Sequence, residues 1–112
     1  MAKTSNERRS HVRVAIPCLA AVFDRAGRAV ATSRIKDLSN GGALLHVPVT
    51  VLPEIGARIN VTISIPRTTK NSRLLEDFAA PARVVRHAAA DGAEVSEMAI
   101  EFENPLHLML EA

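Results

Sequence analysis

Hydrophobic and polar residues alternate with a period of two along much of the chain. Isoleucine or valine occupies every second position from residue 59 to residue 65, and polar residues stand between them. Bulky apolar residues alternate with glutamate or alanine in the same way between residues 97 and 103. Successive side chains of an extended strand point to opposite faces, so each pattern predicts a β-strand with one buried face.

The first apolar segment carries the same alternation with one interruption. One face of this segment carries Val12, Val14, Ile16 and Cys18. After Pro17, the bulky positions become Leu19, Ala21 and Phe23. Because proline cannot donate a ladder hydrogen bond, we expect a bulge or sharp bend at Pro17 that re-aims the strand.

Turn residues divide the rest of the chain into short segments. We expect a turn at 24–28 with a positive φ at Gly27, a turn at 39–42, a connection over 48–56, a polar loop over 67–77 and a turn at 89–93. The strands between them cover 29–38, 43–47, the segment around Ile59, 78–88 and 94–103. Six short strands without a long helical period predict an all-β domain, a small six-stranded antiparallel β-barrel over residues 11–103.

The two ends of the chain differ from the barrel. Residues 1–10 are polar and basic and contain no apolar anchor, which predicts a flexible N-terminal arm. Asn104 suits a helix N-cap and Pro105 suits the first helical position, so residues 104–112 predict a short C-terminal helix. So short a helix needs support, and we expect its leucines to pack on the barrel or on a partner.

Length and composition fit one globular domain. The chain has 112 residues, of which 47% are hydrophobic and 23% are charged. Its longest apolar run is broken by Pro17 and falls short of the ~18 residues that a membrane-spanning helix needs. There is no signal-peptide pattern, and the single cysteine cannot form an internal disulfide, so we expect a cytoplasmic protein.

Catalytic and metal-binding motifs are not found in the sequence. The four histidines lack the short spacing of a metal site, and there is no serine elbow, phosphate loop or dinucleotide fingerprint. Cys18 lies within an apolar run, where a small buried hydrophobe is a better interpretation than a reactive thiol. We therefore expect no enzymatic activity, no metal and no cofactor.

Positive charge is concentrated at the N-terminal end. The net charge is +2, but residues 1–36 hold eight Lys or Arg against two acids, whereas residues 37–112 hold six against ten. Arginine outnumbers lysine by eleven to three, and its planar fork suits phosphates and guanine edges. Taken alone, this charge is also typical of a solvated face.

Two local patterns stand where predicted strands begin or end. The first is Arg8-Arg9-Ser-His-Val-Arg13, where the arm enters the first strand, and the second is Asp37-Leu-Ser-Asn-Gly-Gly42. Each alone fits a structural role, because arginine clusters are common in such a chain and Asp-x-Ser-x-x-Gly is typical of turns.

Together, and on this predicted barrel, the two patterns resemble the PilZ domain, the bacterial receptor module for cyclic di-GMP. The family carries Arg-x-x-x-Arg, usually after another basic residue, and then Asp/Asn-x-Ser-x-x-Gly. The matching residues are Arg9 and Arg13, with Arg8 before them, and Asp37, Ser39 and Gly42. Met98-Ala99 departs from the family, which often has glycine there in the last strand, and this concerns barrel packing rather than the ligand.

The resemblance implies a cyclic di-GMP site formed by Arg8, Arg9, Arg13, Asp37, Ser39, Gly41 and Gly42. Arginine forks can engage guanine O6 and N7 or phosphate oxygens, and Asp37 supplies an acceptor for the guanine N1–H and N2 amine. Ser39 can bond phosphate or base, and the two glycines let backbone amides approach a ligand. Arg8 is expected to hold a second copy of the ligand, as in family members that bind a stacked dimer.

The resemblance also implies a receptor or adaptor that acts on a partner protein in motility, exopolysaccharide or adhesion control. Because the arm has no apolar anchor and carries arginines that a dianionic ligand can pair, we expect it to order on ligand binding. One alternative is a PilZ-like adaptor that works without nucleotide. Another is a basic small barrel that binds nucleic acid, although such barrels stack bases on exposed aromatic residues. Because this chain has three phenylalanines and no tyrosine or tryptophan, nucleic acid is the weaker alternative.

Overall fold

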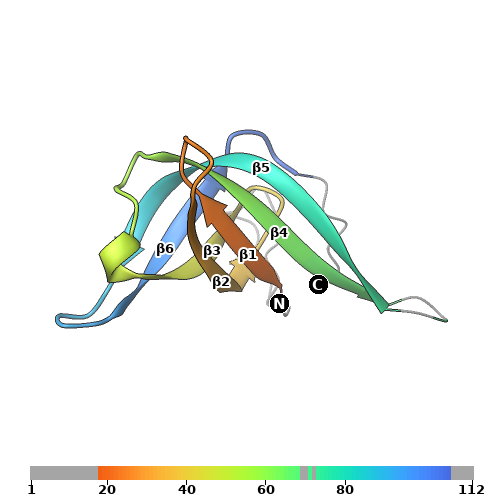
Figure 1. The fold of residues 1–112 in the computed structure, drawn as a ribbon, viewed down its shortest axis with the longest axis horizontal. Helices are drawn as coiled ribbons and strands as arrows, with labels where there is room; N and C mark the ends of the chain where they lie inside the picture. Colours follow the sequence, from red (N-terminus) through yellow and green to blue (C-terminus); the bar gives the residue numbers. More distant parts are fainter. Residues whose placement is uncertain (1–17, 69–70, 72, 107–112) are drawn as a thin grey trace, which may run out of the picture.

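Every strand pairs antiparallel with two neighbours, so the sheet closes into a barrel in the order β1-β2-β3-β6-β5-β4 (Figure 1). The computed structural model describes residues 18–68, 71 and 73–106. Its elements are β1 (Leu19–Phe23), β2 (Ala29–Leu38), β3 (Gly42–Pro48), the 3-10 turn η1 (Val49–Val51), β4 (Arg58–Thr68), β5 (Arg73–Ala88) and β6 (Val95–Phe102). The predicted six-stranded antiparallel barrel is confirmed.

Alternate residues of all six strands fill the interior. On β4, the side chains of Ile59, Val61, Ile63 and Ile65 are at most 3% exposed, while Arg58 and Asn60 face outward. The core is almost wholly aliphatic. Phe102 is buried within it, and Phe78 is half-buried and packs against it. Hydrophobic burial on this scale, worth ~25 cal/mol for each Å² removed from water, holds the barrel closed.

Strands β4 and β5 form a longer hairpin than the sequence indicates. The polar loop predicted over 67–77 is wrong for most of its length, because the two strands stay paired as far as Thr68 and Arg73. Polar contacts link the strands there: Arg67 Nε donates to Glu76 Oε1 at 2.9 Å, and Ser64 Oγ donates to Asp77 Oδ1 at 2.7 Å. Cross-strand polar pairs can stabilise a hairpin that lacks alternating apolar residues. The alternation of apolar residues therefore did not predict the first part of β5, residues 73–77.

Strand β1 buries its smaller side chains. Cys18, Ala20 and Val22 are at most 1% exposed, whereas Leu19 is 47% exposed. The expected shift of the buried face to Leu19, Ala21 and Phe23 is therefore not found, and Pro17 lies outside the described residues. Burial raises the pKa of the Cys18 thiol, partly offset by the nearby Arg67 charge, which agrees with the expectation of a buried, unreactive cysteine.

Strand β2 contains an extra residue near its end. Ile35 pairs with Leu45 and Asp37 pairs with Leu44, so Lys36 has no partner of its own on β3. Ser33 and Ile35 point inward, and the next inward residue is Leu38. The bulge at Lys36 thus reverses the alternation and turns Asp37 from the interior to the outer face.

Strand β5 contains a second bulge, in the part of the strand that pairs with β6. Val84 pairs with Ile100 and Arg86 pairs with Ala99, which leaves Val85 as the extra residue. Val84 is fully buried, whereas Val85 and Arg86 are both exposed. This bulge turns Arg86 outward, just as the first bulge turns Asp37.

The turn and terminal predictions have mixed outcomes. Gly27 has a φ of +85°, as predicted, and Asp24 Oδ1 accepts backbone N–H bonds from Ala26 and Arg28 in that turn. Residues 104–106 are neither helix nor strand, although the Leu106 amide donates to the Asn40 carbonyl at 2.7 Å. The remainder of the predicted C-terminal helix and the whole predicted arm, residues 1–10, lie outside the described residues.

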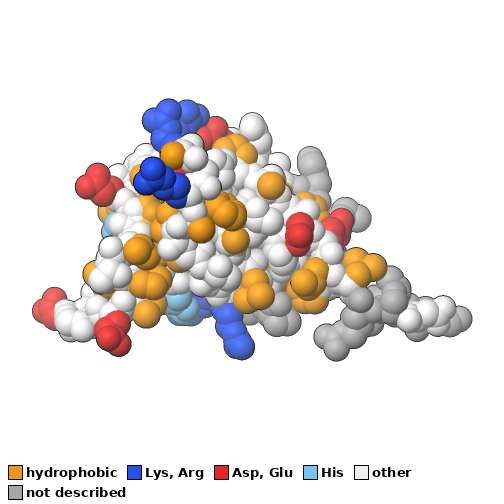
Figure 2. All heavy atoms as spheres, in the orientation of Figure 1, with side chains coloured by type: hydrophobic (Ala, Val, Ile, Leu, Met, Phe, Trp, Pro, Cys, Tyr) orange, Lys and Arg blue, Asp and Glu red, His pale blue; other side chains and the backbone are white. Residues whose placement is uncertain are grey.

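Hydrophobic side chains also reach the surface of the barrel. Figure 2 shows them on one face, including the region of η1, where Val49 and Val51 are 42% and 44% exposed. Within the residues that the structure describes, no helix is long and apolar enough to cross a membrane.

Candidate functional site

The turn between β2 and β3 is organised by the side chain of Ser39. The backbone N–H groups of Gly41 and Gly42 both donate to Ser39 Oγ at 3.2 Å, and the Ser39 amide donates to the Gly42 carbonyl at 2.9 Å. Ser39 is only 6% exposed. A serine that accepts bonds from amides two and three residues ahead closes a compact turn, so this hydroxyl has a structural role in the barrel itself.

Gly42 stands where a side chain has no room. It pairs with Glu101 of β6, and a Cβ atom at this position would overlap the carbonyl oxygen of Ile100. The φ of Gly42 is not in the left-handed region, so the need for glycine comes from the close approach of β3 to β6. Gly41 lies beside it, and its carbonyl accepts the Phe102 amide at 2.9 Å.

Asp37 lies on the outer face just before this turn. Its side chain is half-buried, and it makes no hydrogen bond or ion pair with any residue of the described segments. The turn that follows is closed by Ser39 and not by Asp37. Among the described residues, the carboxylate is therefore a hydrogen-bond acceptor without a bonded partner on the outer face of β2.

A charged cluster borders Asp37 on the same face. Lys36 Nζ donates to Glu97 Oε2 of β6 at 2.7 Å, and His46 Nε2 of β3 lies 3.7 Å from the same oxygen. The hydrogen bond raises the pKa of Lys36 and lowers the pKa of Glu97, so both groups are charged near neutral pH. Such exposed pairs add little stability, but this one directs the lysine ammonium to Glu97, and the Asp37 charge contributes a smaller upward shift of the Lys36 pKa.

The arginine half of the predicted site cannot be placed. Arg8, Arg9 and Arg13 lie outside the described residues, while Asp37, Ser39, Gly41 and Gly42 lie together at the β2–β3 turn. No group of three or more metal-ligating side chains occurs among the residues with described positions.

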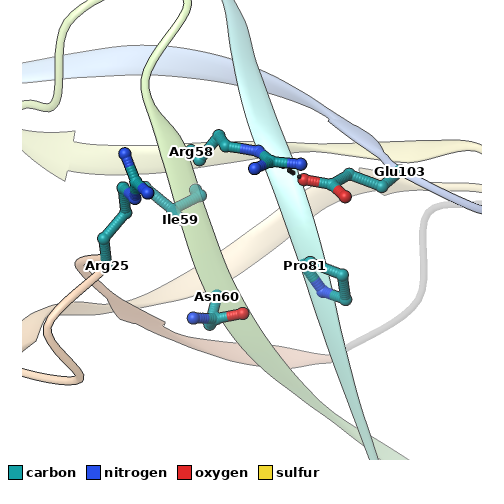
Figure 3. A pocket seen from close by; sticks show the side chains of 6 residues that line it. All are labelled: Arg25, Arg58, Ile59, Asn60, Pro81 and Glu103. Carbon is teal, nitrogen blue, oxygen red and sulfur yellow. Dashed lines mark hydrogen bonds and ion pairs between the residues drawn. The ribbon is translucent and has the colours of Figure 1, made fainter.

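A surface pocket of about 260 Å³ lies elsewhere on the barrel (Figure 3). It is lined by Arg25, Arg58, Ile59, Asn60, Pro81 and Glu103, and none of these belongs to either sequence pattern. Figure 3 shows Arg58 directed toward Glu103, where its Nε donates to Oε2 at 2.9 Å. That ion pair already satisfies one of the two arginines, so we place the candidate site at the β2–β3 turn and not here.

The surroundings of Asp37 are a feature that the sequence did not predict. Leu44 of β3 lies next to it on the outer face, and Ala99 of β6 lies next to Leu44; both are half-buried. The available indication was a break in alternation, because two charged residues separate Ile35 from Leu38. A one-residue break does not by itself show a bulge, so these neighbours of Asp37 were not predicted.

The chain belongs to the PilZ domain family, whose profile matches residues 7–109. The matched range contains both sequence patterns, and members of this family are receptors or adaptors. The family resemblance inferred from the motifs is confirmed.

Two solved structures share the fold. The inhibitor of motility MotI/DgrA of Bacillus subtilis matches with a TM-score of 0.72 and 16% identity, over 88% of this chain and 44% of that one. The PilZ domain of YcgR from Escherichia coli, solved with c-di-GMP, matches with a TM-score of 0.58 and 18% identity, over 87% of this chain and 79% of that one. The present chain thus spans less than half of MotI/DgrA, and at these identities the likeness concerns the fold alone. No curated protein has a sequence that matches this chain.

Proposed function

We propose that this protein binds cyclic di-GMP on the outer face of the barrel at the β2–β3 turn and passes the ligand state to a partner protein. The observation that carries the proposal is the Asp37 carboxylate, which the bulge at Lys36 turns outward and which has no partner in the described segments. An acceptor held in this way can read the N1–H and N2 amine of guanine. The YcgR PilZ domain was solved with c-di-GMP, which supports the same ligand class here.

The arginines of the N-terminal segment complete the proposed site. Arg9 and Arg13 would clamp the ligand against the barrel, and Arg8 would hold a second copy. Motility control is the favoured output, because MotI/DgrA is an inhibitor of motility. Exopolysaccharide and adhesion control remain alternative outputs of the same receptor.

Replacing Asp37 by alanine separates recognition from turn formation. We expect Asp37→Ala to weaken binding of cyclic di-GMP by roughly 10-fold or more, because a charged acceptor is lost. The melting temperature should stay close to that of the wild type, since Ser39 and not Asp37 closes the turn. Isothermal titration and a thermal melt on one variant measure both quantities. A lowered melting temperature with unchanged affinity would show that Asp37 is structural.

The choice of purine provides a second readout on the same variant. Adenine lacks the N1–H and N2 donors, so Asp37→Ala should cost cyclic di-GMP affinity more than cyclic di-AMP affinity. An equal loss for both ligands would mean that Asp37 does not read the base.

Ordering of the arm is the proposed output of ligand binding. Three arginines close in sequence repel one another, and a dianionic ligand removes that repulsion while offsetting an ordering cost of ~1–2 kcal/mol per residue. NMR order parameters for residues 6–12 should be low in the free protein and rise toward rigid-backbone values on saturation. Residues 59–65 of β4 serve as the internal control and should stay rigid in both states. An arm with the same order parameters in both states would exclude this output, whatever the ligand affinity.

A further inference from the structure

A small surface pocket lies where the β1–β2 turn meets strands β4 and β5 (Figure 3). Its volume is about 260 Å³. Pockets that hold a whole small-molecule ligand measure ~300–1,000 Å³, so this one suits a single side chain better than a dinucleotide. We therefore consider it as a contact for a partner protein and not as a second nucleotide site.

Two polar side chains at this pocket have no partner among the described residues. Arg25, in the β1–β2 turn, and Asn60, on β4, are both exposed, and neither side chain forms a hydrogen bond or an ion pair there. Figure 3 shows Arg25 on one side of the hollow and Pro81 and Glu103 on the other. A guanidinium offers five N–H donors and a carboxamide two, so both residues can donate to an acceptor placed between them.

Arg58 of β4 is a second arginine at this pocket, and an ion pair fixes its direction. Its Nε–H donates to Glu103 Oε2 at 2.9 Å, and the side chain is still 52% exposed. That bond uses one of the five N–H donors, so the terminal N–H groups stay available. A guanidinium already held by a carboxylate also loses less conformational freedom when it binds an anion.

Positive charge is in excess around the pocket. Two arginines and one glutamate line it, which gives the lining a net charge of +1. Arg83 of β5 stands directly opposite Arg58, and like charges in that position destabilise a sheet. Glu101 of β6 pairs with Arg83 on its other side and balances that charge. The remaining +1 matches a monoanion such as a carboxylate better than a dianion such as phosphate.

The pocket adjoins the candidate nucleotide site. The Phe102 amide donates to the Gly41 carbonyl of the β2–β3 turn at 2.9 Å. The next residue, Glu103, donates its amide to the Pro81 carbonyl at 3.0 Å and lines the pocket. A protein seated in the pocket would therefore lie close to the turn where the nucleotide is proposed to bind.

We propose that this pocket receives the carboxylate of an aspartate or glutamate side chain on a partner protein. Arg25 and Arg58 donate to the carboxylate oxygens, and the Asn60 amide adds a third donor. The ring of Pro81 provides an apolar wall for the methylene groups of the incoming side chain. This inference rests on the proposed role as an adaptor for a partner protein, and it does not depend on nucleotide recognition at Asp37.

NMR titration of the nucleotide-free full chain tests the proposal. The probe is the capped peptide Gly-Glu-Gly, and capped Gly-Gln-Gly is its neutral counterpart of nearly the same shape. We expect the glutamate peptide to cause saturable shifts of the Nε–H signals of Arg25 and Arg58 and of the Asn60 side-chain amide. The glutamine peptide should cause none, because it has no charge to match the pocket.

Two arginine variants in one turn separate a direct contact from a general effect of charge. Arg25→Ala should weaken binding of the glutamate peptide by roughly 10-fold, because a charge-assisted contact is lost. Arg28→Ala removes the same charge from the same turn, but Arg28 does not line the pocket. We expect it to weaken binding by less than about threefold, because salt screens an exposed charge that makes no contact. Both side chains are exposed, so both variants should melt like the wild type.

Equal losses for the two variants, equal shifts with the two peptides, or no shift of the Arg25 signal would each overturn the proposal. Inorganic phosphate is the third probe, and tighter binding of phosphate than of the glutamate peptide would make the pocket a site for a dianion, against the proposal. Because no nucleotide is present, a negative result here leaves the nucleotide site standing. Failure to bind cyclic di-GMP in a separate titration would instead contradict the proposed function.

Discussion

Arg9→Ala and Arg13→Ala should each weaken cyclic di-GMP binding by roughly 10- to 150-fold. Each substitution removes a charge-assisted bidentate contact worth ~1.5–3 kcal/mol. The two residues stand four apart, so in an extended segment they share a side and lie ~13 Å apart, enough to reach two ends of a folded dinucleotide. Isothermal titration of each variant measures the loss.

These arginines should matter for the ligand and not for the barrel. Both precede the first residue of the described core, Cys18, so the melting temperature of each variant should match the wild type. The conservative variants Arg9→Lys and Arg13→Lys keep the charge but lose the planar fork, and should bind with intermediate affinity. Titration curves for both alanine variants that superimpose on the wild-type curve would remove the N-terminal arginines from the site.

Gly42→Ala should destabilise the barrel and disable the site together. The added Cβ overlaps the Ile100 carbonyl, so β3 and β6 must move apart at their closest approach. Overpacking of this kind costs ~1–3 kcal/mol. In a domain of this size, that corresponds to a fall in melting temperature of roughly 5–20 °C, measurable by calorimetry.

Gly92→Ala is the control for the glycine prediction. A Cβ at Gly92 meets nothing within 4 Å, but its φ of +74° imposes backbone strain on any other residue. Its cost should be ~1–2 kcal/mol, with no effect on ligand affinity because the β5–β6 turn is remote from Asp37 in the sheet. A Gly42→Ala protein that melts and binds like the wild type would show that β3 shifts freely, against the packing described here.

Most of the barrel could be predicted from the sequence because its strands bury one aliphatic face. Residues 29–38 match β2 at both ends, and the Ile59 strand has the predicted buried face. The β4–β5 hairpin could not be predicted in full, since Arg67–Glu76 and Ser64–Asp77 stabilise it through polar contacts. In β1 the bulky residues misled the prediction, because Ala20 and Val22, and not Leu19, fill the interior.

The sequence patterns pointed to the β2–β3 turn but did not give its geometry. Asp37, Ser39, Gly41 and Gly42 lie at one turn because they are close in sequence, and their contact with a ligand stays a prediction. The roles within the turn depend on contacts that the sequence does not show: the two amides bonded to Ser39, and the Ile100 carbonyl against Gly42. The outward direction of Asp37 could not be foreseen because it follows from a bulge one residue long.

Titration of the wild-type protein with cyclic di-GMP, with GMP and a single-stranded oligonucleotide as comparison ligands, tests the central claim most directly. We predict saturable binding of cyclic di-GMP, with a stoichiometry of two if Arg8 holds a second copy, and much weaker binding of GMP and the oligonucleotide. Tight binding of the oligonucleotide, or no heat of binding with cyclic di-GMP, would contradict the assignment of this PilZ domain as a nucleotide receptor.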